Sequence, residues 1–250
     1  AKGTSDRLLM GWIFMDNSRS WLTNANEDLE KKTALERIEF AAENLPGKFS
    51  LASSFGAQSA VSLHLITLVM PKIPVILIDT GYLFPETYQF VDQLTEALDL
   101  DVHVYQSKMS PAWQEARYGK LWEKDTLALN EYNQRNKVEP MDRALNELEV
   151  GTWFAGLRRD QSKSRHVLPI IQTFKGRVKV HPIVDWSNRD IHQYLQKHRL
   201  PYNPLWNKGY VSIGDKHSTK PLTLGLSEED TRFGGKQREC GLHVDTLAGL

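Results

Sequence analysis

Short apolar runs alternate with longer stretches of helical spacing along this chain. The runs predict β-strands at residues 49–53, 75–78, 102–105, 152–156 and 179–183. The second run is continuously apolar, which is typical of a strand covered on both faces in a parallel sheet. Apolar residues three and four positions apart predict helices at 27–45, 59–70, 85–98 and 187–198, with a mostly helical stretch at 111–149.

Strands that alternate with helices predict right-handed crossovers and an α/β fold with a doubly wound, mainly parallel sheet. Residues 25–200 are expected to form this α/β domain, and residues 1–24 precede it as a segment of unknown role. From about Pro201, glycine, proline and polar residues replace the periodic pattern. Residues 201–250 are therefore predicted to form an irregular C-terminal extension.

Bulk composition excludes several classes of function. Lysine plus arginine and aspartate plus glutamate both number 31, so the formal net charge is zero. A general nucleic-acid binder needs a basic excess to neutralise phosphates, so nucleic acid is not an expected partner. Any anion site must come from a local cluster of cations. No apolar run approaches the ~20 residues that span a bilayer, so no membrane segment is expected.

Cys240 is the only cysteine among 250 residues. It cannot form an intrachain disulfide, which fits a reducing compartment, and we expect a cytoplasmic protein. A cysteine-ligated Fe–S cluster or a cysteine-rich zinc site needs several thiolates. Neither is expected within one chain, and no metal site is predicted.

Two candidate segments follow the first two predicted strands, and ligands of open α/β sheets bind at such carboxyl ends. Residues 53–59 combine small hydroxyl residues with a glycine before a helix, which suits a phosphate or sulfate. An ordinary turn with a serine cap is the alternative. Asp79 leads the second segment and could accept hydrogen bonds from a ribose or an adenine amine, or could cap the next helix.

A third candidate segment follows the predicted strand at 152–156 and carries four cations in ten residues. Only one acid stands among them, which favours an anion clamp over a solvated face. Guanidinium forks match phosphate and sulfate oxygens at two points. A flexible surface loop is the alternative. The cations are Arg158, Arg159, Lys163 and Arg165.

The fourth candidate segment surrounds Cys240 near the C-terminus. A cysteine attacks as its thiolate. Lys236, Arg238 and His243 would favour that thiolate, and Glu239 would oppose it. A lone cysteine is often an inert core residue, but charged and glycine neighbours make a core position unfavourable here. We therefore predict that Cys240 is a nucleophile.

Five motifs together resemble the phosphoadenylyl-sulfate (PAPS) reductase family, over roughly residues 27–244. The motifs are residues 53–59, 79–87, 137–140, 156–165 and 239–243. The resemblance implies a fold like that of the adenine-nucleotide α-hydrolases, which include the ATP pyrophosphatases. Their pyrophosphate loop reads Ser-Gly-Gly-x-Asp-Ser, whereas Phe55 and Gln58 here replace a glycine and the acid. That departure favours a substrate that carries sulfate.

The resemblance implies a two-step reduction that is part of sulfate assimilation. The Cys240 thiolate attacks the sulfuryl sulfur of PAPS, expels adenosine 3′,5′-bisphosphate and becomes S-sulfocysteine. Reduced thioredoxin, or glutaredoxin, then releases sulfite. One cysteine cannot resolve this intermediate alone, so an external dithiol is required as co-substrate and partner. No bound cofactor is implied, and the family commonly forms homodimers.

Related adenylyl-sulfate (APS) reductases carry a cysteine pair before the segment that matches Lys137, for an Fe–S cluster. Residues 133–136 hold no cysteine here, which favours the 3′-phosphorylated substrate. A cluster-free reductase of APS is the alternative. A non-enzymatic nucleotide-binding or redox-sensing module with Cys240 as its switch is a further one.

Carried over by position, the matching residues form a phosphate loop, an adenosine end, a set of anion-binding residues and a catalytic tail. The first two groups are Ser53, Ser54, Phe55, Gly56 and Ser59, and Asp79, Thr80 and Gly81. The anion-binding residues are Lys137, Gly156, Arg158, Arg159, Gln161, Ser164, Arg165 and Arg232. The implied catalytic residues are Cys240, Arg238 and His243.

Overall fold

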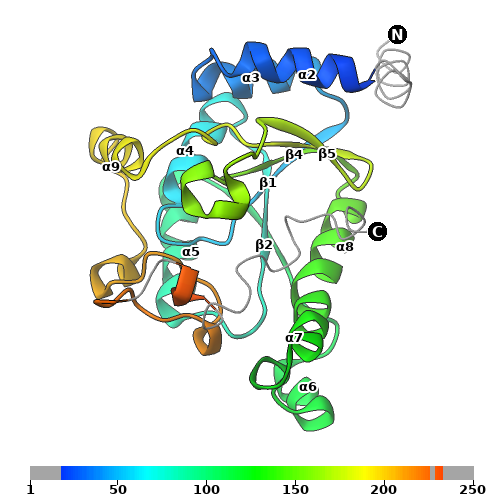
Figure 1. Ribbon diagram of the computed structural model, residues 1–250, viewed down its shortest axis with the longest axis vertical. Helices are drawn as coiled ribbons and strands as arrows, with labels where there is room; N and C mark the ends of the chain where they lie inside the picture. The colour runs from blue at the N-terminus through cyan, green and yellow to red at the C-terminus, as the bar shows by residue number, and fades with distance from the viewer. Residues whose placement is uncertain (1–17, 226–228, 233–250) are drawn as a thin grey trace.

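A six-stranded sheet with helices on both faces forms the centre of the protein (Figure 1). The computed structural model describes residues 18–225 and 229–232. The strand order is β3-β2-β1-β4-β6-β5, and only the edge pair β5 and β6 is antiparallel. The predicted doubly wound, mainly parallel α/β fold is confirmed. The strands are β1 (Lys48–Ala52), β2 (Pro74–Ile78), β3 (Asp101–Tyr105), β4 (Val150–Ala155), β5 (Ile171–Phe174) and β6 (Arg177–Val180).

Two helical layers cover the sheet. Figure 1 shows α4 and α5 on one side of the strands and α7 and α8 on the other. The α4 side holds the larger apolar core, and Trp153 of β4 packs with Met141 of α8 on the opposite side. The helices are α2 (Ser18–Leu29), α3 (Ala34–Asn44), α4 (Ala60–Val69), α5 (Pro85–Leu98), α6 (Pro111–Tyr118), α7 (Thr126–Asn133), α8 (Glu139–Glu147) and α9 (Asn188–Lys197).

The single helix predicted at 27–45 is wrong, because the chain forms α2 and α3 with a break between them. Thr33 causes the break. Its hydroxyl accepts from the backbone N–H of Glu36, and the Glu36 carboxylate accepts from the N–H of Thr33. This reciprocal capping box begins a new helix. α2 also crosses the expected boundary at residue 24 and is joined to β5, since the Asn26 amide bonds both backbone groups of Ile171.

The fifth predicted strand is displaced and lacks its partner. The expected strand at 179–183 is instead β6, which starts and ends earlier, and the hairpin strand β5 was not predicted. Lys175 and Gly176 form the hairpin turn with φ of 49° and 75°. Two consecutive positive φ values match the tight turn that fits the twist of paired strands.

The described part of the C-terminal extension is irregular, as predicted. Between residues 201 and 225 and at 229–232, its regular structure consists of short 3₁₀ turns at Pro204–Lys208, Lys216–Ser218 and Glu229–Thr231. It nevertheless packs tightly on the domain. Asn203 is fully buried, donates its side-chain amide to the carbonyl of Phe55 and its N–H to the carbonyl of Ala57. The extension therefore braces the loop after β1.

Candidate active site

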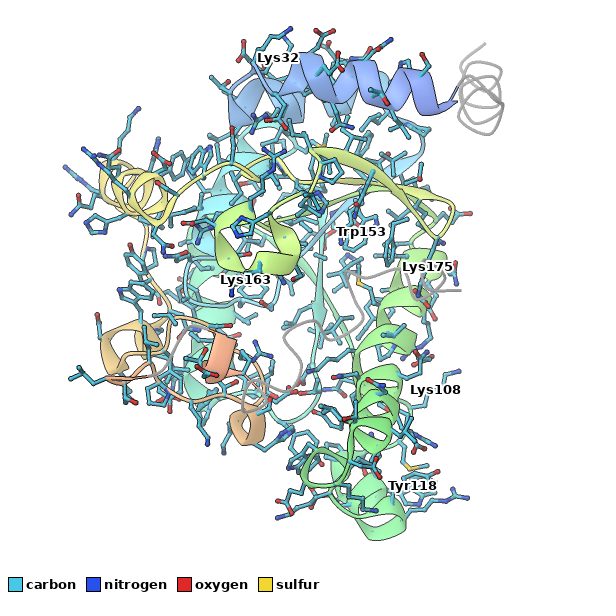
Figure 2. All side chains as sticks on the ribbon, in the orientation of Figure 1. Lys32, Lys108, Tyr118, Trp153, Lys163 and Lys175 are labelled. Carbon is cyan, nitrogen blue, oxygen red and sulfur yellow. The ribbon has the colours of Figure 1, made fainter. Side chains whose placement is uncertain are left out.

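A cavity of about 290 Å³ opens where β1, β2 and β4 end. Its walls come from the loop after β1, the ends of β2 and β4, the segment after β4, and residues 211–215 of the extension. This is the edge at which parallel α/β sheets bind their ligands. Trp153 lies between the sheet and α8, and Lys163 lies on the 3₁₀ turn after β4 (Figure 2).

The loop at residues 53–59, called the serine loop below, presents backbone donors to this cavity. Phe55 adopts the left-handed conformation, with φ of 48°, and its N–H is held by the Ser53 hydroxyl at 3.2 Å. Among the described residues, the N–H groups of Ser54, Gly56 and Ala57 donate to no protein acceptor. Open N–H groups ahead of helix α4 favour an anion here.

Within residues 18–225 and 229–232, four cations line the same cavity: Lys137, Arg158, Arg165 and Arg232. Arg158 is buried, and its guanidinium donates to the carbonyl of Trp186 and to the side-chain oxygens of Gln58 and Asn188. Those three acceptors are uncharged, and they fix the guanidinium in place. Such a fixed fork suits phosphate and sulfate oxygens.

Arg232 reaches the cavity from the extension. Its guanidinium lies so close to Gly214 that a Cβ on this glycine would stand 2.3 Å from Nη2. Its Nη1 donates to the Ser212 hydroxyl at 3.4 Å. A side chain at position 214 would therefore displace the arginine. The segment 211–215 and Arg232 together form a wall of the cavity, and Ile213 packs beside Ala57 of the loop after β1.

Lys137 stands in a π-helical turn, Gln134–Val138, between α7 and α8. Its ammonium lies 2.9 Å from the carboxylate of Asp215, and both side chains are buried. Burial alone would raise the pKa of Asp215, but Lys137, by charge and hydrogen bond, and the Thr80 hydroxyl outweigh it and hold that pKa well below its ordinary value. Single π turns inside helices are frequent at functional sites.

Most of the predicted substrate residues in the described part of the chain line this cavity. They are Ser53, Ser54, Gly56, Ser59, Thr80, Lys137, Gly156, Arg158, Gln161, Arg165 and Arg232. Another five lie outside its lining: Phe55, Asp79, Gly81, Arg159 and Ser164. The predicted catalytic residues Arg238, Cys240 and His243 lie outside the described residues.

The residues outside the lining have visible structural roles. Asp79 accepts from Gly81 N–H, the Tyr88 hydroxyl and the Gln106 amide, so it holds the turn after β2. Gly81 has a φ of 76°, and a Cβ at this position would collide with the ring of Pro111. Phe55 packs in the apolar core. Arg159 donates to the Glu30 carboxylate and to the Leu168 carbonyl. The Ser164 hydroxyl forms a hydrogen bond with the Ser162 hydroxyl.

Several cavity residues carry no motif signal of their own. Gln58, Ser212 and Asp215 line the cavity and contact its cations. Gln58 stands inside the serine loop, so its position alone could have marked it. Asp215 lies in the extension, where the sequence shows no periodic pattern, so its position relative to the sheet could not be predicted.

A model of the phosphoadenosine phosphosulfate reductase domain matches residues 48–221, which include the cavity's loops after β1, β2 and β4. The chain belongs to this family. The phosphoadenosine 5′-phosphosulfate reductases of Zymomonas mobilis and Salmonella heidelberg are each 60% identical over 222 residues, which cover 89% of this chain and 91% of theirs.

Solved structures agree with this family. The phosphoadenylyl-sulfate reductase of Candida auris, in a phosphate complex, has a TM-score of 0.70 and 30% identity, covering 80% of this chain and 96% of that one. The FMN adenylyltransferase of Candida glabrata has a TM-score of 0.54 at 17% identity, covering 83% and 72%, and shows the fold alone. In the chain itself, no helix within the described ranges is long and apolar enough to span a bilayer.

Proposed function

We propose that this chain reduces 3′-phosphoadenylyl sulfate to sulfite and adenosine 3′,5′-bisphosphate, with thioredoxin as reductant, in assimilatory sulfate reduction. One observation carries the proposal. Lys137, Arg158, Arg165 and Arg232 meet the open N–H groups of the serine loop in a single cavity at the strand ends. The names of the relatives, which match nearly the whole chain, support the same substrate class.

The cavity has two chemical halves that fit such a substrate. Ile76, Ile78, Met141 and Trp153 supply apolar surface for an adenine ring. The four cations and the serine loop supply the polar half for the phosphosulfate. An elongated ligand with an apolar ring at one end and anions at the other would satisfy both.

Cys240 supplies the nucleophile in this proposal. Its thiolate attacks the sulfuryl sulfur, so an S–S bond forms and the bond from sulfur to the bridging phosphate oxygen breaks. The electron pair of that bond leaves with the bisphosphate, and Cys240 carries the sulfonate. This splits a difficult reduction into two steps.

Thioredoxin completes the reaction. One of its thiolates attacks the Cys240 sulfur, and sulfite departs with the electron pair of the broken S–S bond. Its second thiol then attacks the mixed disulfide, which frees Cys240 as a thiol and leaves thioredoxin oxidised by two electrons. Glutaredoxin can supply the same dithiol chemistry.

The cations have a defined role in the first step. Negative charge grows on the leaving phosphate oxygen as its bond to sulfur breaks. A fixed cation there stabilises the transition state more than the bound substrate, and so raises the rate. Arg158 is firmly held for this role, because three protein oxygens fix its guanidinium.

Sulfite release tests this proposal. With PAPS and reduced thioredoxin, we expect turnover by the native chain and none by Cys240→Ser, while both bind adenosine 3′,5′-bisphosphate equally. The same assay with APS measures whether the 3′-phosphate is read, and we expect a kcat/KM at least about tenfold lower. Equal turnover by the serine variant would overturn the proposal.

The proposal includes the assembly state and the compartment. We expect a cytoplasmic homodimer that needs no bound cofactor or metal. Light scattering of the purified chain, with and without a chelator, measures the mass, and the sulfite assay measures the effect of the chelator. A monomer, or loss of turnover after chelation, would contradict this part.

A further inference from the structure

The carboxylate of Asp215 joins four segments of the chain beneath the cavity. Asp215 is 1% exposed. Its Oδ1 accepts from the Thr80 hydroxyl at 2.5 Å, and its Oδ2 accepts from the Tyr132 hydroxyl at 3.0 Å and from the Lys137 ammonium at 2.9 Å. The donors come from the end of β2, from α7 and from the π turn.

The backbone around Asp215 is fixed as well. It forms an isolated antiparallel bridge with Leu83, and the N–H of Lys216 donates to the carbonyl of Tyr82 at 2.8 Å. The extension is therefore attached to the turn after β2 at Asp215 and Lys216. These contacts place the backbone of Asp215 without involving Lys137.

Aromatic side chains close the outer side of this network. His217 stacks on Trp122 at 3.8 Å between ring centroids, and its Nε2 lies 3.1 Å from the Tyr132 hydroxyl. Burial lowers the pKa of His217 to about 4, more than the charge of Asp215 raises it, so the ring is neutral at pH 7. Tyr132 donates its one proton to Asp215, so His217 is the Nε2–H tautomer and donates to Tyr132.

The ammonium of Lys137 requires a partner that fixes its position. A lysine ammonium is a point charge on a flexible four-carbon stem and does not fix its own direction. Its stem here passes Tyr132, whose ring centroid lies 5.4 Å from Nζ. Lys137 is 6% exposed, and an ammonium so deeply buried requires a compensating charge. Asp215 provides it at the cavity wall.

We propose that Asp215 is a positioning residue, which holds the Lys137 ammonium where the anionic end of the substrate binds. Thr80 and Tyr132 orient the carboxylate, and the carboxylate orients the lysine. Asp215 acts on the reaction only through Lys137. This inference rests on the proposed function, because it assigns the anion of that substrate to Lys137.

A double-mutant cycle tests the inference. The variants are Asp215→Asn, Lys137→Gln and the pair, and kcat and KM are measured for sulfite release. Asp215→Asn should lower kcat/KM at least about tenfold in the native background and less than about twofold in the Lys137→Gln background. Equal losses in the two backgrounds, or no loss at all, would overturn it.

Two further variants keep the test independent of folding. Tyr132→Phe removes one donor to Asp215 and leaves every charge in place, and it should give a smaller loss that also disappears in Lys137→Gln. An unchanged kcat/KM in Tyr132→Phe contradicts the inference even if Asp215→Asn fails to fold. Asp142→Asn is the matched control, because Asp142 forms a Lys175 pair of the same 2.9 Å away from the cavity and should leave kcat/KM unchanged.

The outcomes separate the two proposals. A native chain that releases no sulfite overturns the proposed function and this inference together. A native chain that releases sulfite, with losses that persist in the Lys137→Gln background, overturns the inference alone.

Discussion

Arg37 is a deeply buried cation outside the cavity, and it shows how single residues stabilise the fold. It is 1% exposed and forms two hydrogen bonds to Asp185, of 2.6 and 2.8 Å, and others to the carbonyls of Leu29 and Pro182. Burial raises the pKa of Asp185, but Arg37 outweighs it and leaves that pKa below its ordinary value. One guanidinium thus joins the end of α2, helix α3 and the segment before α9.

Arg37→Met should therefore destabilise the protein by about 3 kcal/mol, because it leaves buried carbonyls without donors and Asp185 without its cation. Urea denaturation measures the free energy of unfolding. Lys31→Met is the control, since its pair with Asp28 is largely exposed and should cost under about 1 kcal/mol. Similar losses in the two variants would contradict this account of Arg37.

Single residues were the most predictable part of the site. The serine loop and the cation-rich segment after β4 carry local patterns, and residues of both line one cavity, although Phe55, Arg159 and Ser164 do not. Asp215 could not be predicted, because its role comes from Lys137 and Thr80, which are distant in sequence. Arg159 has the same sequence signal as Arg158, yet an α2–α3 acid, Glu30, takes its guanidinium. Tertiary contacts decide between such neighbours.

At the scale of the elements, the parallel strands β1 and β4 approach closely where they begin. Gly47 and Gly151 face each other there, and a Cβ on Gly151 would stand 2.7 Å from the carbonyl oxygen of Pro46 and 2.8 Å from Cα of Gly47. The Thr152 hydroxyl donates to the same carbonyl at 2.8 Å. The two strands that carry the cavity loops are therefore held at a fixed separation.

Gly151→Ala should destabilise the protein by about 2–3 kcal/mol, because backbone on both sides has to move to admit the methyl group. Thermal unfolding followed by circular dichroism measures the loss. The control is Gly176→Ala, which has φ of 75° and no neighbour within 4 Å, so it should cost only about 1 kcal/mol of backbone strain. A Gly151 variant as stable as the control would contradict the close approach.

Helix α5 was predicted well, whereas the break between α2 and α3 and the strand β5 were missed. Pro85 at the first turn set the start of α5, and the predicted range 85–98 is the observed one. The break at Thr33 was missed because apolar spacing continues across it. Strand β5 was missed because its four residues are too few to show a periodic pattern. It is a strand because it pairs with β6.

At the scale of the whole molecule, two buried histidines couple stability to pH. Burial, with Lys179 as the next cause, lowers the pKa of His181 to about 3, and burial lowers that of His217 to about 4. An unfolded histidine has a pKa of about 6.5. The unfolded chain therefore binds more protons below that pH, so the histidine contribution is complete above it and is lost as pH falls toward 4.

The free energy of unfolding should thus decrease below about pH 6.5, with each histidine adding up to about 1.4 kcal/mol per pH unit. Urea denaturation between about pH 7.5 and 5 measures the slope. His181→Gln and His217→Phe should each reduce it, and the double variant should reduce it most. Asp215 adds no slope there, because its depressed pKa acts only below about pH 4. A slope unchanged in the double variant would contradict the assignment.

The fold class of the whole molecule could be predicted from the alternation of strands and helices. The distribution of charge around the cavity could not be predicted from the composition. A chain with 31 cations and 31 anionic side chains gathers four cations and one acid around its cavity. Charge segregation of this kind arises only when the loops at the strand ends meet. It gives the cavity a local excess of positive charge in a protein of zero net charge, which is the basis for the anion site that we propose.

The most direct test of the central claim is the mass of the intact protein after mixing with PAPS in the absence of thioredoxin. We predict a gain of one sulfonate group, located on the peptide that contains Cys240 and removed when reduced thioredoxin is added. The Cys240→Ser chain should gain nothing. An unmodified native chain that still releases sulfite, or a sulfonate on any other residue, would contradict the account.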